Sequence, residues 1–299
     1  MRHILLTGGA GQVGGALRRL AWPADVVLHA PPRAELDITD AASVAAAFAR
    51  APFAAVVNPA AYTAVDRAES EVGAAFRVNA LAPALLADAA RAAAIPLIHL
   101  STDYVFDGSR PGRYREDDPV APIGIYGASK LAGEYAVLQG SPRGTVLRTA
   151  WVLSATGSNF LKTMLRVGAE RPVLTVVADQ IGCPTGADDL ARAIQTIALR
   201  QIAEPDAPCG IYNFVNGGEA SWHDLACAIF AEAAAYGGPR PTVETVTTDR
   251  YPTAARRPLN SRLSTERIAM DYGIRPRDWR AAVAEIVAQV YKGSEGSAS

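Results

Sequence analysis

The strongest constraint on the fold is a glycine-rich turn near the N-terminus. The turn, TGGAGQVG at 7–14, follows an apolar segment of strand length at 4–6 and opens a segment of helix length. Glycines at this spacing let the backbone approach a pyrophosphate closely, and the helix N-terminus supplies free N–H groups and a favourable dipole. A purely structural turn is the alternative, but the position between strand and helix favours a dinucleotide site.

Apolar strand-length segments and helix-length segments alternate over the first 150 residues. The strands are expected at 4–6, 26–29, 55–57, 97–100 and 146–147, and the helices at 14–20, 41–49, 74–94 and 126–138. This βαβα order predicts an α/β fold with a doubly wound parallel sheet of the Rossmann type. The strands read as continuous apolar runs, as expected for strands that are buried on both faces.

The alternation becomes less regular after residue 151. We expect helices at 159–170, 187–200, 221–235 and 280–291, strands at 173–178 and 210–215, and a structured loop over 237–263. The predicted domains are a dinucleotide-binding domain at 1–150, rejoined by elements within 187–216, and a mainly substrate-binding domain at 151–292. We expect residues 293–299 to form a disordered tail.

Composition excludes several classes of protein. The net charge of −1 gives no reason to expect a nucleic-acid partner, and no run of eighteen apolar residues predicts a membrane span. The three cysteines, an odd number without a CxxC pair, argue against a disulfide framework or a structural zinc site. We expect no signal peptide before the first strand. We therefore expect a cytoplasmic protein with neither nucleic acid nor membrane as partner.

The end of the second strand bears on the choice of cofactor. A carboxylate at this place commonly binds the adenosine ribose, but the sequence reads HAPPR at 29–33. Arg33 would suit a 2′-phosphate and so favours NADP over NAD, although an ordinary solvated arginine is an equal alternative. Asp37 is the better candidate for the adenine end.

Tyr126 and Lys130 form a YxxxK pair on a predicted helix. Residues at i and i+4 share one helix face, so we expect the ammonium near the phenol. A neighbouring positive charge would lower the pKa of Tyr126 toward neutrality, as a proton donor to a carbonyl oxygen requires. The spacing alone is weak evidence, and it gains weight from the glycine turn.

Polar residues follow the strand that ends at Leu100. Ligands of doubly wound sheets bind beyond the carboxyl ends of the strands. Ser101 or Thr102 would therefore hold a substrate carbonyl, with local backbone capping as the alternative. The segment NPAAY at 58–62 ends another strand with small residues that would let a dinucleotide lie close. Asn79 either links to this site or bonds local backbone.

These motifs together resemble the extended short-chain dehydrogenase/reductase superfamily and, within it, the dTDP-4-dehydrorhamnose reductase family. The segments that carry the closer resemblance are STDYVFDG at 101–108, VLRTAWV at 146–152, DQIGCPT at 179–185 and RPLNSRL at 257–263. The resemblance covers residues 2 to about 290. It implies that NADPH or NADH reduces the 4-keto group of dTDP-4-dehydro-L-rhamnose to give dTDP-L-rhamnose.

The resemblance also implies roles for individual residues. Tyr126 would donate the proton, Lys130 would hold the nicotinamide ribose, and Thr102 would polarise the carbonyl. The implied cofactor contacts are Gly11, Gln12, Val13, Asp37, Ile38, Ala60, Ala61 and Tyr62, together with the catalytic Tyr126 and Lys130. The glycine turn itself adds Gly8 and Gly14 as candidates, and the end of the second strand adds Arg33. The implied substrate contacts are Thr102, Asp103 and Trp151, with Arg257 and Arg262 for the diphosphate and Arg256 as a weaker candidate. A buried structural role is the alternative for Trp151.

One departure from the family concerns metal. Some members bind Mg²⁺ between subunits through glutamates, one of them just after the glycine turn, where this chain has Ala16. Asp188 and Glu285 match the other acidic positions only in part. We therefore expect no metal site, no need for Mg²⁺, and a monomer or weak homodimer.

Two other functions are compatible with the same fold. A sugar-nucleotide epimerase or dehydratase would use YxxxK but recycle its cofactor. A dehydratase normally carries further acid and base residues after Thr102, whereas Asp103 is followed here by Tyr104. A cofactor-binding regulatory subunit without activity is the second alternative, and the intact set of Thr102, Tyr126 and Lys130 argues against it.

Overall fold

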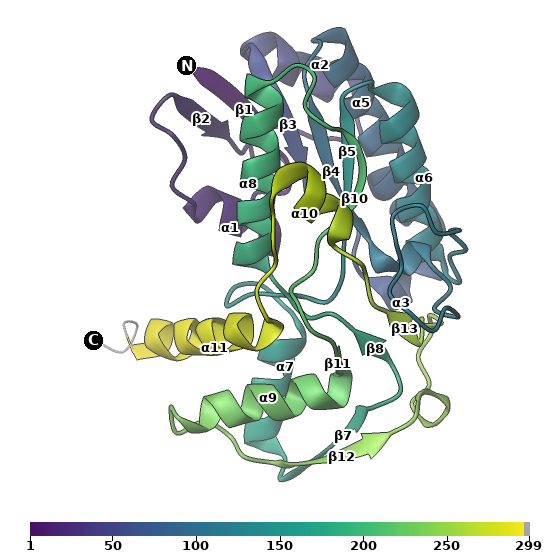
Figure 1. Cartoon of the computed structure of the whole chain (residues 1–299), viewed down its shortest axis with the longest axis vertical. Coiled ribbons are helices and arrows are strands. Elements are labelled where there is room, and N and C mark those ends of the chain that lie inside the picture. Colours follow the sequence, from purple (N-terminus) through teal and green to yellow (C-terminus); the bar gives the residue numbers. More distant parts are fainter. Residues whose placement is uncertain (296–299) are drawn as a thin grey trace.

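The central element of the computed structural model, which describes residues 1–295, is a parallel six-stranded sheet in the order β10-β5-β4-β3-β1-β2 (Figure 1). Its strands are β1 Arg2–Leu6, β2 Val26–His29, β3 Phe53–Asn58, β4 Leu97–Thr102, β5 Gly144–Thr149 and β10 Gly210–Asn213. The predicted doubly wound Rossmann sheet is thereby confirmed. The sixth strand comes from the second half of the chain and pairs with β5.

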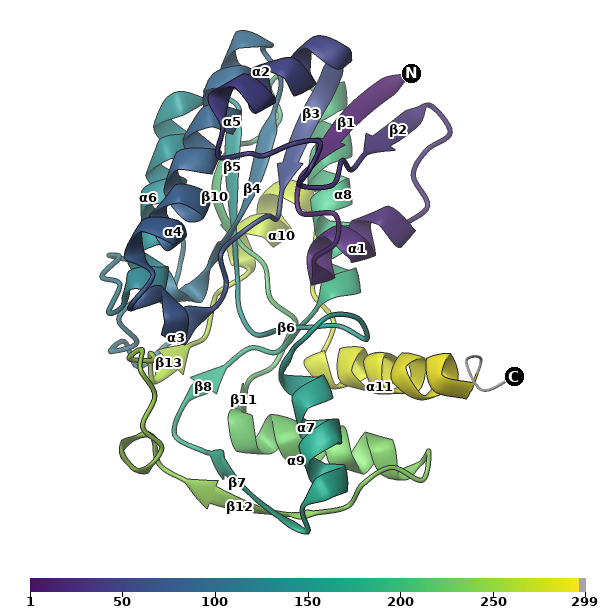
Figure 2. The same cartoon turned by 180° about the vertical axis from the view of Figure 1, so that it is seen from behind.

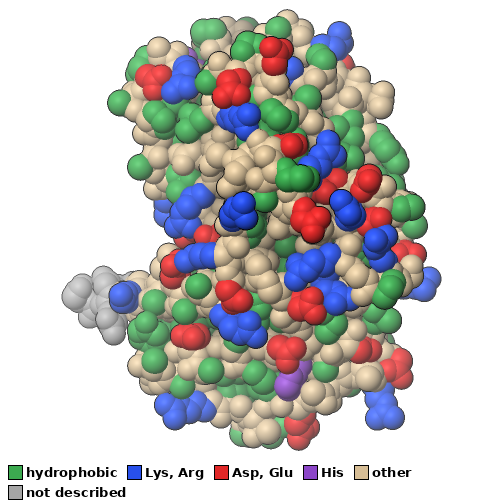
Figure 3. All heavy atoms as spheres, in the orientation of Figure 1, with side chains coloured by type: hydrophobic (Ala, Val, Ile, Leu, Met, Phe, Trp, Pro, Cys, Tyr) green, Lys and Arg blue, Asp and Glu red, His purple; other side chains and the backbone are tan. Residues whose placement is uncertain are grey.

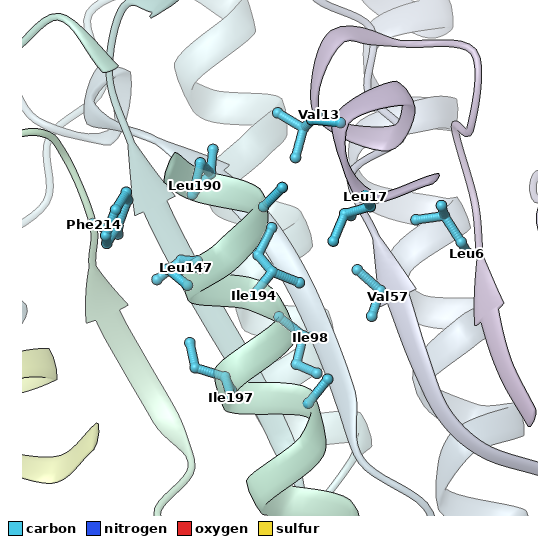
Figure 4. Packing of buried hydrophobic residues seen from close by; sticks show 14 of the residues in the cluster. Leu6, Val13, Leu17, Val57, Ile98, Leu147, Leu190, Ile194, Ile197 and Phe214 are labelled. Carbon is cyan, nitrogen blue, oxygen red and sulfur yellow. The ribbon is translucent and has the colours of Figure 1, made fainter. Parts of the chain in front are cut away.

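Successive residues of each strand contribute to two different cores, which explains the continuous apolar runs. Ile4 and Leu6 pack on one face of the sheet, and Leu5 packs on the other. The first face is covered by helices α1 (Gln12–Arg19), α8 (Ala187–Ala203) and α10 (Glu266–Tyr272), and Figure 4 shows Ile194 and Ile197 of α8 against Leu147 and Ile98. The second face is covered by α2 (Ala41–Arg50), α5 (Ala82–Ala92) and α6 (Ile125–Gly140).

The helix expected at 74–94 is built from several parts. Helix α4 (Val72–Phe76) continues through a π-helical segment (Arg77–Leu81) into α5, and the short α3 (Val65–Ala68) precedes it. This continuous run, Val72–Ala92, is the one helix among residues 1–295 that is long and apolar enough to cross a membrane, by length and composition only. Its buried residues, among them Leu86, pack on the sheet, and core helices of soluble proteins pass the same test.

A smaller domain lies below the carboxyl ends of the strands (Figures 1 and 2). Its helices are α7 (Phe160–Glu170), α9 (Trp222–Ala234) and α11 (Trp279–Glu295). Its strands are β6 (Val152–Leu153), β7 (Val173–Val177), β8 (Ile181–Gly182), β9 (Thr185–Gly186), β11 (Ala220–Ser221), β12 (Thr242–Val246) and β13 (Asn260–Ser261). Short 3-10 turns lie at Asp103–Val105 and Thr248–Arg250. Ser221 caps α9 through a capping box with Asp224.

Two features of the second half differ from expectation. The segment expected to be loop at 237–263 contains β12, which pairs in parallel with β7, and α10 follows it. The signal is weak there because β12 is an edge strand with exposed residues. The disordered tail was wrong for 293–295, because α11 continues to Glu295, and its remaining residues, 296–299, lie outside the described part.

A buried ion pair fixes α6 to the sheet. Arg148 of β5 donates to both carboxylate oxygens of Glu134 at 2.9 and 2.7 Å, and Ser101 donates to the same carboxylate at 2.5 Å. The side chains of Arg148 and Glu134 are only 2% and 1% exposed. Because charge this deeply buried depends on its partner, loss of either residue leaves the other uncompensated.

We predict that Arg148→Met lowers the free energy of unfolding by about 3–5 kcal/mol, because it leaves the buried carboxylate of Glu134 without its charged partner. The double variant Arg148→Met/Glu134→Leu should regain most of this loss. Arg91→Met, which removes an exposed pair with Asp88, is the matched control and should cost about 1 kcal/mol or less. Urea unfolding monitored by circular dichroism measures all three. Equal losses for Arg148→Met and Arg91→Met would contradict this account of α6.

Candidate functional site

A cleft of about 800 Å³ runs along the carboxyl ends of the strands and into the smaller domain. Its lining brings together residues far apart in the sequence: the glycine turn, the segments that follow β2, β3, β4 and β5, helix α6, and Trp222 of α9. Figure 2 shows the ends of β1 and β3 directed toward the smaller domain, with α1 beginning beside them. This is the place where doubly wound sheets bind their ligands.

The glycine turn forms a tight cradle, because side chains at two of its glycines would collide with neighbouring backbone. Gly8 has φ +59°, and a Cβ there would lie 2.9 Å from the backbone of Ala60. A Cβ at Gly14 would lie 2.1 Å from the carbonyl oxygen of Gly8. Helix α1 begins at Gln12 without a side-chain cap on Gly11, so the N–H groups of its first turn have no intrahelical acceptor and face the cleft. These features match the shape and charge of a dinucleotide pyrophosphate.

One end of the cleft is lined by residues that follow β2. Arg33, Asp37 and Ile38 all contribute to this lining. The carboxylate of Asp37 accepts hydrogen bonds from the backbone N–H and the hydroxyl of Thr39, which lower its pKa. Arg33 is exposed and lines the cleft, so its guanidinium is accessible to an anion.

The segment after β3 divides into two parts. Ala60 and Ala61 line the cleft, whereas Tyr62 does not. The hydroxyl of Tyr62 donates to Glu71 at 2.7 Å, and its backbone N–H donates to Asn79 Oδ1 at 2.8 Å. Asn79 also donates to the Ser129 hydroxyl at 3.0 Å, so it joins this segment to α6. Asn79 therefore ties the backbone of a segment 17 positions away to the helix that carries Tyr126 and Lys130, while its own side chain lies outside the cleft lining.

Tyr126 and Thr102 meet in the cleft. The Thr102 hydroxyl neighbours the phenol, and the ring of Tyr104 packs edge-on to Tyr126 at 5.5 Å between centroids. Desolvation raises the pKa of Tyr126, while the neighbouring Thr102 hydroxyl lowers it. The phenol is thus a protonated group placed beside a second hydroxyl, an arrangement suited to hydrogen-bonding and protonating one carbonyl oxygen.

The expected effect of Lys130 on Tyr126 was wrong for this structure. Burial raises the pKa of Tyr126, and Lys130 is not the group that opposes this rise. The Lys130 ammonium donates instead to the carbonyl oxygen of Leu100 at 2.6 Å, and it lies 3.3 Å from His99 Nε2. Burial lowers the pKa of Lys130 to about 8, and Glu134 opposes that change. Lys130 still lines the cleft, behind Tyr126.

Asp103 presents an unsatisfied acceptor at the cleft. Its Oδ1 accepts from the Thr102 hydroxyl at 2.9 Å, but its buried Oδ2 has no hydrogen-bond partner within residues 1–295. Burial raises the pKa of Asp103 to about 6, and the neighbouring hydroxyls of Ser261 and Thr102 limit the rise. Because a buried acceptor without a partner is costly, Oδ2 is well placed to accept a ligand hydroxyl.

Trp151 forms an aromatic wall with Trp222, a residue that sequence reasoning missed. The two rings stack with centroids 3.5 Å apart, and both line the cleft. Trp151 has a left-handed backbone, φ +47°, and a Cβ at Gly182 would lie 2.4 Å from its ring. No local pattern around Trp222 indicates this role, because the pairing joins segments 71 positions apart.

The three arginines proposed for a diphosphate have different surroundings. Arg257 lines the cleft, pairs with Asp66 at 2.8 Å and donates to the Tyr104 hydroxyl at 3.3 Å. Arg256 is exposed and outside the cleft lining. Arg262 also lies outside it, since its guanidinium bonds Asn260 and the Pro111 carbonyl and pairs with Glu219.

The acidic residues considered as metal ligands form ion pairs with arginines. Asp188 pairs with Arg19 at 3.0 Å, and Glu285 pairs with Arg277. Ala16 is fully buried. Within residues 1–295 no group of three or more His, Cys, Asp or Glu side chains is arranged to hold a metal ion.

Comparison with known proteins places the chain in one family. The family model described as the RmlD substrate binding domain matches residues 1–292. The dTDP-4-dehydrorhamnose reductase of Sinorhizobium fredii is 43% identical over 95% of this chain and 96% of its own length, and that of Burkholderia thailandensis is 44% identical over 94% and 96%.

Solved structures agree with this placement. A dTDP-4-dehydrorhamnose reductase from Clostridium acetobutylicum has a TM-score of 0.90 and 33% identity, covering 96% of this chain and 99% of its own. The reductase from Bacillus anthracis, solved in complex with NADP, has a TM-score of 0.89 and 33% identity, covering 97% and 100%. The chain is therefore a member of the dTDP-4-dehydrorhamnose reductase family, within the extended short-chain dehydrogenases/reductases.

Proposed function

We propose that this protein reduces the 4-keto group of dTDP-4-dehydro-L-rhamnose to dTDP-L-rhamnose with NADPH or NADH, as a step of nucleotide-sugar biosynthesis. The observation that carries the proposal is the Tyr126–Thr102 pair, set in the same cleft as the Gly8–Gly14 cradle. Family membership and the relative solved with NADP support it.

We further propose a cytoplasmic protein, monomeric or weakly dimeric, with neither nucleic acid nor membrane as partner. The face in Figure 3 carries interspersed charges of both signs.

The cofactor site follows from the turn and its neighbours. The N–H groups at the start of α1 would bind the pyrophosphate, Arg33, Asp37 and Ile38 the adenosine end, and Ala60 and Ala61 the middle. Lys130 would hold the nicotinamide ribose. When bound, a reduced nicotinamide supplies the hydride for carbonyl reduction. No metal enters this scheme.

The protein's own chemistry is placement and proton donation. Tyr126 would hydrogen-bond the keto oxygen, and Thr102 would do so by turning its one hydroxyl proton from Asp103 Oδ1 to the substrate. Together they would fix the carbonyl and favour negative charge on that oxygen. Tyr126 would then donate its phenolic proton, because a developing alkoxide is far more basic than a phenolate. The raised pKa of Tyr126 keeps that proton in place at neutral pH.

The substrate contacts divide by chemistry. Asp103 Oδ2 would accept a sugar hydroxyl, and the Trp151–Trp222 wall would cover the apolar ring face and methyl group of a deoxysugar. Arg257 would meet the diphosphate, since guanidinium suits phosphate oxygens. Arg262 could join it only by leaving its present partners.

The direct test is a spectrophotometric assay with dTDP-4-dehydro-L-rhamnose and each reduced cofactor. We expect loss of absorbance at a one-to-one ratio with the keto sugar consumed. Turnover of the sugar without net oxidation of the cofactor would instead indicate an epimerase. Cofactor binding with no turnover of either kind would indicate a regulatory subunit.

We predict that Tyr126→Phe lowers kcat by at least about a hundredfold, because it removes the proton donor and little volume. Binding of NADPH, followed by its fluorescence, should stay within about twofold of the unmodified protein. Tyr135→Phe, at an exposed position of the same helix, is the control and should leave kcat unchanged. A Tyr126→Phe variant with near-normal turnover would show that the proton donor is another group.

We predict that Arg33→Ala raises the KM for NADPH about tenfold or more and leaves the KM for NADH nearly unchanged. The reason is loss of a charged hydrogen bond to the 2′-phosphate, which NADH lacks. Arg50→Ala, exposed at the end of α2, controls for general loss of positive charge. Equal changes for both cofactors would rule out a 2′-phosphate contact.

A further inference from the structure

A line of buried polar side chains crosses the sheet beneath the cleft. The line runs from Thr7, directly after β1, through Asn58 at the end of β3 and His99 in β4, to Lys130 in α6. The distances are 2.5 Å from Thr7 Oγ1 to Asn58 Oδ1, 3.0 Å from Asn58 Nδ2 to His99 Nδ1, and 3.3 Å from His99 Nε2 to Lys130 Nζ. Each of the four residues is at most 2% exposed.

His99 is an unusual residue for its place. Its neighbours in β4, such as Ile98, are apolar core residues, and an imidazole that is fully buried is costly unless both ring nitrogens have partners. Both nitrogens do face polar groups, Asn58 on one side and Lys130 on the other. Burial and the charge of Lys130 lower the pKa of His99, so the ring is neutral, with one donor and one acceptor.

The charge of Lys130 decides how hydrogens are arranged along this line. An ammonium only donates, so His99 Nε2 must accept from it, and Nδ1 then carries the ring proton. Nδ1 must donate to the amide oxygen of Asn58, which requires the amide to be turned over from the orientation in which its nitrogen lies 3.0 Å from Nδ1. A neutral amine permits the reverse, in which Nε2 donates to the amine, Nδ1 accepts from the Asn58 amide nitrogen, and the Asn58 oxygen accepts from Thr7. The line therefore has two consistent states, one for each charge of Lys130.

The other groups near Lys130 come from three elements. From β4, the Leu100 carbonyl oxygen accepts from the ammonium. From α6, Glu134 favours the charged form, although its carboxylate is already paired with Arg148 of β5. His99 is therefore the side chain that directly contacts the amine, opposite the helix from which Lys130 extends.

We propose that His99 is a positioning residue for Lys130: its neutral ring accepts a hydrogen bond from the ammonium at Nε2, with the Asn58 amide turned so that its oxygen faces the protonated Nδ1. The Lys130 amine is thereby fixed between β4 and the cleft, at the place where the proposed function puts the nicotinamide ribose. The inference deepens that function and rests on it only for the identity of the ribose.

The composition of the chain makes the amine directly observable. The lysines are Lys130, Lys162 and Lys292, so labelling with ¹³C at Cε gives a simple spectrum, and Lys130→Met assigns the resonance of interest. His99→Leu removes the acceptor. We expect the pKa of Lys130 to fall by about one unit, because a lost hydrogen bond to a charged group disfavours the charged form by that order. His99→Gln, whose amide oxygen can accept at similar reach, should restore it in part.

His223→Leu is the matched control, since His223 lies on α9 in the smaller domain and should leave the titration of Lys130 unchanged. An unshifted Lys130 pKa in a folded His99→Leu variant would overturn the proposal. A measurement on the unmodified protein needs no variant: ¹⁵N spectra at pH 6.5 should show His99 protonated at Nδ1. Protonation at Nε2 beside a charged Lys130 would equally overturn it.

Kinetics separate this inference from the proposed function. In His99→Leu, we expect the KM for NADPH to rise severalfold and the alkaline limb of the kcat profile to move to lower pH with the Lys130 titration. If the Lys130 resonance shifts in His99→Leu but the unmodified protein has no reductase activity, the proposed function is wrong and the positioning role of His99 stands. If the unmodified protein has reductase activity but the resonance does not shift in His99→Leu, the positioning role is wrong and the proposed function stands.

Discussion

The site depends on how α6 buries polar groups against β4 and β5. Tyr126, Lys130 and Glu134 recur every fourth residue, so they lie on one helix face, and that face packs on the sheet rather than on solvent. Lys130 and Glu134 are 1% exposed, and charges so placed require partners. The Leu100 carbonyl oxygen accepts a hydrogen bond from Lys130, and Arg148 donates hydrogen bonds to Glu134. These bonds fix the height and rotation of the helix, and hence where Tyr126 enters the cleft.

The second condition for the site is a close approach of backbone segments. The glycine turn can touch the segment after β3 only because Gly8 and Ala60 are small. The smaller domain reaches the same turn from the other side, where Asn159, the cap of α7, donates to Gln12 at 2.9 Å. The cleft is thus closed by contacts from both domains, which places cofactor and substrate ends in one cavity.

Much of this arrangement could be predicted from the sequence, because it depends on local signals. The turn, the apolar runs and the YxxxK spacing each reflect a short-range rule of helix or strand geometry, and the sheet and the placement of Gly8, Tyr126 and Thr102 in one cleft followed. What could not be predicted depends on tertiary neighbours. The pKa of Tyr126 is governed by desolvation, Trp222 reaches Trp151 through the packing of another domain, and Arg262 is held by partners remote in sequence.

The central claim is reduction of a keto sugar at a site where Tyr126 supplies the proton. Its most direct test is isotopic: the unmodified protein is supplied with dTDP-4-dehydro-L-rhamnose and a reduced cofactor deuterated at the transferable position of the nicotinamide. The account predicts one deuterium at C4 of the product sugar for each cofactor oxidised, observed by NMR and mass spectrometry. Product that carries no deuterium at C4, or cofactor that keeps its label while sugar is converted, would contradict it.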